Sequence, residues 1–388
     1  MANKLWYSRA IAAVATGALA VTLAACGGEG AGGGSGAGDD AGAEEGGLVG
    51  VAMPTETSER WIADGAAVEE GLEAAGYEVD LQFAGDDIPT QQQQIDAMIN
   101  AGAEALIIAA IDGTTLTGQL EAAAAQDIPV ISYDRLIRDS EDVDFYVSFD
   151  NFQVGVAQAN ALLNGLGLVD EEGEPVEDAP EGPFNVELFA GSLDDNNAHF
   201  FWDGAMSVLE PLIDDGTLVV PSEQTDIDQA ATQRWLQENA QSRMEDLLTA
   251  HYDGNEQVDG VLSPYDGLSR GIIEALRSAG YEDDAMPVIT GQDAEIASVK
   301  LIADGVQDST IFKDTRLLAD QAVTAAEALL AGEEPEANNT TDYDNGLKVV
   351  PSYLLPVVTV YADNIESELV DSGYWTAEEV ESGVADTE

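Results

Sequence analysis

Short apolar runs alternate with amphipathic stretches along the chain from residue 48 onward. Between the runs, apolar side chains recur at helical spacing, as at Trp61, Val68 and Leu72. Strands and helices that alternate in this way favour βαβ units, with a parallel sheet and right-handed crossovers. The first series predicts strands at residues 48–53, 79–83, 105–111, 129–133 and 145–149.

The same alternation starts again near residue 185. An acidic insert with Pro and Gly at 170–182 separates the two series and is predicted to be a surface loop. Two doubly wound series in one chain predict an α/β fold with two Rossmann-like lobes and a cleft between them. The second series predicts strands at 185–190, 218–220, 258–263 and 287–290, and helices at 197–213 and 231–250.

The start of the chain has the pattern of an exported, lipid-anchored protein. Lys4 and Arg9 precede an apolar run at 10–25, which ends in Leu-Ala-Ala directly before Cys26, the only cysteine. This pattern describes a secretory signal peptide over residues 1–25. A cysteine at this position resembles the lipobox of bacterial lipoproteins, in which that residue is acylated. The alternatives are a signal peptide with an incidental cysteine, and a membrane span, which needs a longer run of roughly 20 residues.

The residues after Cys26 have almost no side chains to bury. Residues 27–47 consist mainly of Gly, Ala and acids, so we predict a disordered tether between the lipid and the folded part. The protein is then expected on the outer face of the cell membrane. A single cysteine leaves no internal disulfide, so the fold must rest on its apolar core.

The charge of the chain is strongly negative. There are 75 Asp and Glu against 13 Lys and Arg, a formal net charge of −62. Such a balance disfavours nucleic acid as a partner. The acids are spread over the whole chain, which favours a solvated surface adapted to high salt over a surface that binds cations or a basic partner.

The few basic residues are therefore informative. A cation at a helix N-terminus opposes the helix dipole, so Arg60 at the start of a predicted helix needs another explanation. Five basic residues stand just beyond predicted strand ends, where salt adaptation does not require them: Arg60, Arg135, Arg138, Lys313 and Arg316.

Acids and amides also follow the predicted strands, where ligands bind in open parallel sheets. A single Asp after a strand is usually a helix N-cap, which fits Asp150 and Asp266 as well as a binding role does. Capping does not explain Arg135 beside Asp134, or Lys313 after an apolar strand. Carboxylates, amides and cations around a cleft suit a neutral sugar, because each hydroxyl both donates and accepts.

Aromatic residues near these positions could pack on the apolar face of a sugar ring. Any one of them could equally be a core residue. Trp61 and Trp235 are favoured because polar residues flank them. The candidates are Trp61, Phe200, Phe201, Trp202 and Trp235.

Metal and cofactor chemistry have little support. His199 and His251 match no zinc motif, and the segment 342–346 has calcium-like residue types but no distal Glu. We predict a turn there, with no metal and no cofactor. The Gly-rich tract follows no strand, so it is no dinucleotide-binding fingerprint.

Several motifs together resemble a known family. They occur in order between residues 50 and 374, and they are specific in combination. The chain resembles the sugar-binding lipoproteins of bacterial ABC importers, of the type I periplasmic-binding-protein fold, in their multiple-monosaccharide and xylose-binding branch. The motifs include AMPTETSERWIADG (52–65), YDRLIRDS (133–140), LFAGSLDDNNA (188–198), SPYDGLSRGII (263–273), GQDAE (291–295), STIFKDTR (309–316) and VVPSYLL (349–355).

The resemblance implies which residues line the cleft. Trp61 and Trp235 would pack on the sugar ring. Two positions depart from the xylose-type branch, Tyr265 where Asn is expected and Trp202 where Arg is expected, and both bear on which sugar is bound. The other implied cleft residues are Arg60, Asp134, Arg135, Asn197, Asp266, Asp293 and Lys313.

The resemblance also implies three crossings between the lobes, near Asp150, Phe312 and Gly346. The N-terminal lobe would then comprise residues 48–149 and 312–345. The other lobe would comprise 150–311 and 346–376, followed by an acidic tail at 377–388.

The implied function is that of a receptor and not of an enzyme. The lobes would close on an aldopentose or aldohexose, and the protein, expected to be a monomer, would deliver it to an ABC transporter permease. One alternative is a sugar-dependent partner of a chemoreceptor or sensor kinase. Another is a secreted glycosidase, since paired carboxylates support acid–base chemistry. With 75 acids, however, pairs such as Asp194-Asp195 arise by chance.

Overall fold

The computed structural model describes residues 46–252 and 256–385. The predicted signal peptide, Cys26 and nearly all of the tether lie outside these ranges. The described residues fall in a single compact unit.

Five strands from the first part of the chain and one from near its end form a six-stranded parallel sheet. Its strand order is β11-β5-β4-β3-β1-β2, with parallel pairing throughout. We call this sheet and its helices the first lobe. The strands are β1 (Leu48–Met53), β2 (Glu78–Phe83), β3 (Ala105–Ile108), β4 (Val130–Tyr133), β5 (Phe145–Phe149) and β11 (Ser352–Leu355), and the helices are α1 (Glu59–Ala74), α2 (Ile88–Ala101), α3 (Thr117–Ala124) and α10 (Thr315–Leu330).

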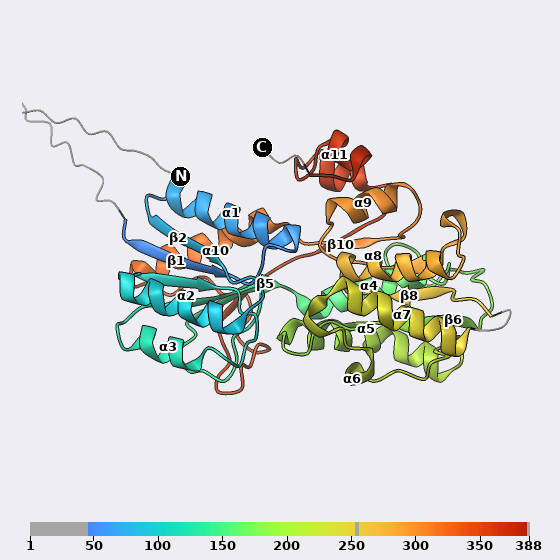
Figure 1. Cartoon of the computed structure of the whole chain (residues 1–388), viewed down its shortest axis with the longest axis horizontal. Helices are drawn as coiled ribbons and strands as arrows, with labels where there is room; N and C mark the ends of the chain where they lie inside the picture. Colours follow the sequence, from blue (N-terminus) through green and yellow to red (C-terminus); the bar gives the residue numbers. More distant parts are fainter. Residues whose placement is uncertain (1–45, 253–255, 386–388) are drawn as a thin grey trace, which may run out of the picture. The chain divides into compact units, whose positions relative to one another are not determined.

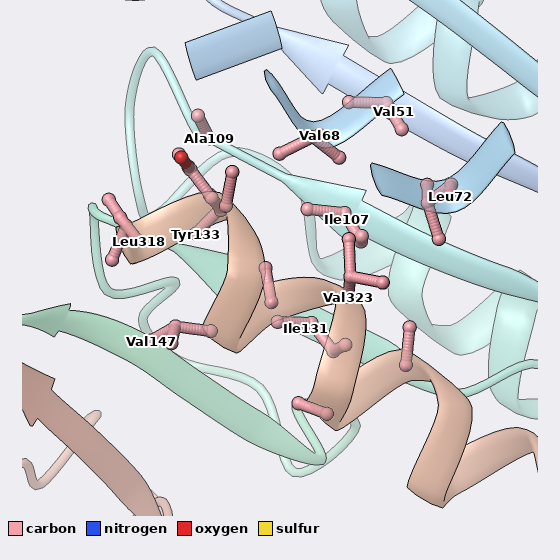
Figure 2. Packing of buried hydrophobic residues seen from close by; sticks show 14 of the residues in the cluster. Val51, Val68, Leu72, Ile107, Ala109, Ile131, Tyr133, Val147, Leu318 and Val323 are labelled. Atoms are coloured by element: carbon pink, nitrogen blue, oxygen red, sulfur yellow. The ribbon is translucent and has the colours of Figure 1, made fainter. Parts of the chain in front are cut away.

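The two faces of this sheet have separate apolar cores. On one face, Val68 and Leu72 of α1 and Val323 of α10 pack against strand residues such as Val51 and Ile107 (Figure 2). The cluster on the other face holds the apolar side chains of α2 and α3. Because both faces are covered, β1, β3, β4 and β5 have continuous apolar sequences, which is why the sequence pattern located them.

The second lobe has a four-stranded parallel sheet in the order β7-β6-β8-β9. Its helices α4 and α5 touch backbone to backbone: a Cβ on Gly155 would lie 2.0 Å from the carbonyl oxygen of Phe201, so only glycine fits. The elements are β6 (Phe184–Leu188), β7 (Leu218–Val219), β8 (Gly260–Leu262) and β9 (Val288–Ile289), with α4 (Asn151–Gly165), α5 (Asn196–Asp214), α6 (Ile227–Ala230), α7 (Gln237–His251), α8 (Asp266–Ser278) and α9 (Ile296–Ala303).

A two-stranded antiparallel ribbon completes the second lobe, made of β10 (Thr310–Phe312) and β12 (Val358–Val360). The C-terminal segment packs there as well. Residues predicted to begin an acidic tail instead form helix α11 (Ala377–Ser382), which starts with a Thr376–Glu379 capping box. Val380 anchors this helix to an apolar cluster around Phe312 and Leu369.

The chain passes between the lobes three times (Figure 1). It leaves β5 for α4 at Asp150, and it leaves β10 for α10 at Lys313 and Asp314. The predicted third crossing near Gly346 is wrong. Residues 352–355 pair with β5, with Ser352 opposite Tyr146, so the crossing falls at 356–357. This segment supplies the backbone partner that the outer edge of β5 would otherwise lack.

Candidate ligand-binding site

A cavity of about 500 Å³ lies among the carboxyl ends of strands from both lobes. It contains eight of the nine predicted cleft residues. From the first lobe come residues after β4 and at the start of α1; from the second come residues after β6 and β9 and around α5. The eight are Arg60, Trp61, Asp134, Arg135, Asn197, Trp235, Asp293 and Lys313.

Arg60 is the centre of a buried ionic cluster. Its side chain is 5% exposed, and its Nε lies 2.9 Å from Asp64 Oδ2. One terminal nitrogen lies 2.5 Å from Asp134 Oδ1, and the other lies 3.5 Å from Asp293 Oδ1. These three carboxylates explain the cation at the start of α1 that the helix dipole disfavours.

Burial and neighbouring charges compete at these carboxylates. Burial alone would raise the pKa of Asp134, but Arg60 and Lys313 outweigh it and lower the pKa, so the carboxylate stays ionised. Burial dominates at Asp64 and raises its pKa to about 6, although Arg60 opposes the rise. Asp64 also accepts a hydrogen bond of 2.5 Å from the Tyr133 hydroxyl. Asp64 therefore links Tyr133 to the Arg60 guanidinium.

Asn197 ties the second lobe to the same cluster. From α5, its Nδ2 donates to the main-chain carbonyl of Asp134 at 2.8 Å. Tyr146 donates to that carbonyl at 2.6 Å and Ser148 at 2.9 Å. The carbonyl is turned toward these donors because Asp134 adopts the left-handed backbone conformation, with φ of 57°.

Left-handed backbone conformations are concentrated at the cavity. Nine non-glycine residues in the described ranges have positive φ, and five of these line the cavity. Strained backbone of this kind persists where the surrounding structure fixes it, and it is typical of functional sites. The five residues are Asp86, Asp134, Arg234, Trp235 and Asp293.

The predicted helix at 231–250 is wrong, because the chain has a kink at Trp235. Residues 231–250 do not form one helix: a 3-10 turn at Gln233–Trp235 precedes α7, with φ of 60° at Arg234 and 55° at Trp235. The turn carries both side chains into the cavity lining. The Trp235 ring lies directly over Gly191, where a Cβ would approach its atoms to 2.0 Å.

The aromatic candidates separate into two groups. Trp61, Phe201 and Trp235 line the cavity, whereas Phe200 stacks on Tyr343 and Trp202 belongs to the core of the second lobe. The Trp61 ring is close to two guanidinium groups. The Cζ atoms of Arg60 and Arg135 lie 4.7 and 5.0 Å from the centroid of the ring.

Some polar atoms at the cavity lack an aligned hydrogen bond within the described residues. Trp235 Nε1 is a buried donor of this kind. Arg135 Nε lies 3.2 Å from Asp195 Oδ2, and Asp293 Oδ1 lies 2.9 Å from Lys313 Nζ, but both contacts are ion pairs without hydrogen-bond alignment. The cavity therefore offers both donors and an acceptor to a ligand.

Asp266 does not line the cavity, which corrects the prediction for this residue. It is fully buried and accepts from Gln307 at 2.9 Å, Thr310 at 3.1 Å and the Glu295 backbone at 2.9 Å. Burial raises its pKa well above the usual value. Asp266 therefore joins α8, α9 and β10 beneath the site.

Arg234 is a cavity residue that the sequence reasoning missed. It lies 3.6 Å from Asp86 and 3.7 Å from Asp194. Because basic residues are scarce in this chain, each of them was a candidate, and this signal could have identified Arg234. Of the 11 basic residues in the described ranges, five line the cavity: Arg60, Arg135, Arg234, Arg270 and Lys313. Of the predicted strand-end bases, Arg138 instead donates to Asn196 at 2.6 Å and Arg316 pairs with Asp314 at 2.7 Å.

The adjacent acids considered for glycosidase chemistry have structural partners. Asp195 is the N-cap of α5 and accepts from the Asn197 backbone at 3.0 Å, besides its ion pair with Arg135. Over the described ranges, no group of three or more His, Cys, Asp or Glu could hold a metal ion. In the same ranges, no helix combines the length and apolar character needed to cross a membrane.

Comparison with known proteins finds extensive similarity. The model of the periplasmic binding protein domain matches residues 49–334. The chain is 53% identical over 340 residues to the multiple sugar-binding periplasmic receptor ChvE of Rhizobium radiobacter, covering 87% of this chain and 93% of that protein. It is 37% identical over 326 residues to the D-xylose-binding periplasmic protein of Escherichia coli K12, covering 84% and 90%.

Solved structures of solute-binding proteins are also similar to this chain. A solute-binding protein of an ABC transporter from Clostridium phytofermentans, with bound β-D-glucose, matches with a TM-score of 0.80 and 44% identity. The match covers 86% of this chain and 99% of that one. A carbohydrate-transporter solute-binding protein from Chloroflexus aurantiacus, in complex with D-glucose, matches with a TM-score of 0.76 and 38% identity over 86% and 98% of the two chains.

Proposed function

Because this chain belongs to the periplasmic binding protein family and has its type I fold, we propose that it is an extracytoplasmic receptor for a monosaccharide. The observation that carries the proposal is the composition of the cavity. Both lobes contribute cations, carboxylates and aromatic rings to one space. No catalytic role is proposed, and the relatives reported above are named as sugar-binding proteins.

The chemistry of the cavity suits a polyhydroxylated ring. Arg135 and Lys313 would donate to hydroxyl oxygens, and Asp293 would accept from hydroxyl protons. Trp61, Phe201 and Trp235 would cover the apolar C–H faces of the ring. The similar proteins are described with D-glucose, D-xylose and multiple sugars, so the proposed ligand is an aldopentose or aldohexose.

Residues of both lobes would have to contact the sugar for it to drive closure. A ligand shifts a conformational equilibrium only by its differential affinity for the two states. Arg60, Asp134 and Arg135 belong to the first lobe, and Asn197 and Asp293 belong to the second. Lys313 lies where the chain crosses between them, so the sugar would bridge both lobes.

A calorimetric screen tests the proposal. The soluble part from Leu48 onward would be titrated with D-glucose, D-galactose, D-xylose and L-arabinose. We expect saturable heat with one molar equivalent of at least one aldose. No heat with any of them, together with unchanged melting temperatures, would rule out the receptor. A sugar that is chemically altered after incubation would instead favour an enzyme.

Two further parts of the proposal concern location and delivery. We propose that Cys26 carries a lipid that holds the receptor on the outer face of the membrane, next to the permease of an ABC transporter. Replacing Cys26 with Ser should move the protein from the membrane fraction to the soluble exported fraction. Equal partitioning of wild type and variant would show that no lipid is attached.

A further inference from the structure

Two helices begin opposite one another across the two lobes. Helix α1 of the first lobe starts after its N-cap residue Ser58, and α9 of the second lobe starts after Glu295. Neither N-cap side chain accepts a hydrogen bond from its own helix. The first N–H groups of each helix, which have no partner within the helix, therefore need acceptors from elsewhere.

Two hydrogen bonds join these helix starts across the lobes, and one of them satisfies a backbone N–H of α9. The Ser58 hydroxyl donates to Glu295 Oε1 at 2.9 Å. The backbone N–H of Ile296, the first residue of α9, donates to Glu59 Oε2 at 3.2 Å. Each helix start therefore supplies an oxygen acceptor to the other. Both contacts join residues 237 positions apart in the sequence.

Glu295 is held rigidly on the second lobe. It is 3% exposed, and it accepts from the Tyr265 hydroxyl at 2.7 Å and from Arg270 at 2.5 Å. Glu59 is less favourably placed: burial raises its pKa and the nearby charge of Glu295 raises it further, against the weaker effects of the Ile296 N–H and of Arg270. The contact to Ile296 thus persists despite repulsion between two carboxylates.

These contacts stand apart from the proposed sugar contacts. Glu59, Glu295 and Ile296 do not line the cavity, and Ser58 lines it without belonging to the Arg60 cluster. They can form only when the two lobes approach, because each joins one lobe to the other. They therefore favour the closed arrangement whatever ligand lies inside.

We infer that Ser58, Glu59, Glu295 and Ile296 form a closure latch that sets the balance between open and closed lobes independently of which sugar is bound. The inference rests on the proposed receptor function. Apparent affinity falls with the fraction of the binding-competent state. A weakened latch must therefore lower the affinity for every sugar by the same factor.

Paired variants at Glu59 give the sharpest test. All proteins carry Cys26→Ser, so that they are handled without detergent, and are titrated with D-glucose and D-xylose. Glu59→Ala removes the acceptor for the Ile296 N–H and should weaken both affinities equally, by roughly 2- to 10-fold. Glu59→Gln keeps an acceptor oxygen and removes the charge beside Glu295, so it should bind at least as tightly as wild type.

A role of Glu59 through charge alone would make the two variants behave alike, because both remove the charge. If Ala and Gln behave alike, or if the loss differs between the two sugars, the latch is overturned. Small-angle scattering of the unliganded proteins is a second readout, in which Glu59→Ala should have the larger radius of gyration. Equal radii of both variants and wild type would also contradict the latch.

Ser58→Ala has a matched control in Thr376→Ala. Thr376 caps α11 entirely within the second lobe and accepts from the Glu379 backbone at 3.2 Å. Ser58→Ala should weaken both sugars, whereas Thr376→Ala should lower only the melting temperature. Wild-type affinity in Ser58→Ala would refute the latch alone. A wild-type protein that binds no aldose would instead refute the receptor, and scattering would still test the latch.

Discussion

Replacing Asp293 with Ala should damage both the stability and the binding of this protein, for two separable reasons. Asp293 Oδ1 lies 2.9 Å from Lys313 Nζ, and the Lys313 side chain is 1% exposed. In the described ranges, Asp293 supplies the only carboxylate within ion-pair distance of that ammonium group. The substitution would therefore leave a buried cation without its partner.

The size of the stability loss follows from this burial. Removing one partner of a buried ion pair costs roughly 3–5 kcal/mol, because the remaining charge is uncompensated. Asp134 also interacts electrostatically with Lys313, so we expect the lower end of that range, about 3 kcal/mol. Loss of a hydrogen bond between a charged group and a sugar hydroxyl adds a binding cost of about 1.5–3 kcal/mol, or roughly 10- to 150-fold in affinity.

The double variant Asp293→Ala/Lys313→Met separates the two effects. Met removes the stranded charge and can pack beside Phe149 and Phe201, whose ring centroids lie 5.7 and 5.6 Å from Lys313 Nζ. Denaturant unfolding should show recovered stability in the double variant, while calorimetry should still show weak binding. Equal unfolding free energies of the single and double variants would refute the buried-charge explanation.

Asp304→Ala is the matched control for this experiment. Asp304 also pairs with a lysine, Lys300, but its side chain is 49% exposed. Exposed ion pairs contribute little to stability. This variant should keep both its unfolding midpoint and its sugar affinity, and a loss as large as that of Asp293→Ala would refute the role assigned to burial.

Three other predictions follow from separate features. Gly191→Ala should displace the Trp235 ring, because the new Cβ would lie 2.0 Å from it. The variant should stay folded, bind sugar more weakly and show changed Trp fluorescence, and wild-type affinity would contradict this contact. Burial raises the pKa of Asp308 to about 6, so the native state takes up a proton at this carboxyl before the unfolded state does, and the contribution of Asp308 to stability should increase as pH falls from 7 to 4. Asp308→Asn should then be more stable than wild type at pH 7 by up to about 3 kcal/mol, with the difference vanishing near pH 4, and a constant difference would refute it. The net charge of −62 predicts a melting temperature that rises between dilute buffer and 1 M NaCl, and a flat curve would mean that the acids are locally compensated.

Much of the fold could be predicted because its signals are local. The runs at β1, β3, β4 and β5 are apolar over a few consecutive residues, since both faces of the sheet are covered. Polar residues directly after such runs, such as Asp134 and Arg135, then fall at the ligand-binding edge of a parallel sheet.

Other features depend on contacts between distant residues. The pairing of β11 with β5 joins positions about 200 apart, and no local pattern distinguished it from a strand of the second lobe. Asp266 lies shortly after β8 and Asp134 directly after β4, yet the Asp266 carboxylate accepts hydrogen bonds from Gln307 and Thr310, near β10. Sequence position alone could not separate a cavity residue from a buried one.

The sequence by itself determined the alternation of strands and helices and the polar residues at the strand ends, because each depends on neighbouring residues. Composition alone showed that basic residues are scarce, which drew attention to Arg60, Arg135 and Lys313. Only the tertiary structure decided that Arg234 and Trp235 turn into the cavity through left-handed backbone, and that Ser58 meets Glu295. Those outcomes depend on which distant groups approach within hydrogen-bond distance, and that approach is fixed by packing of the whole chain.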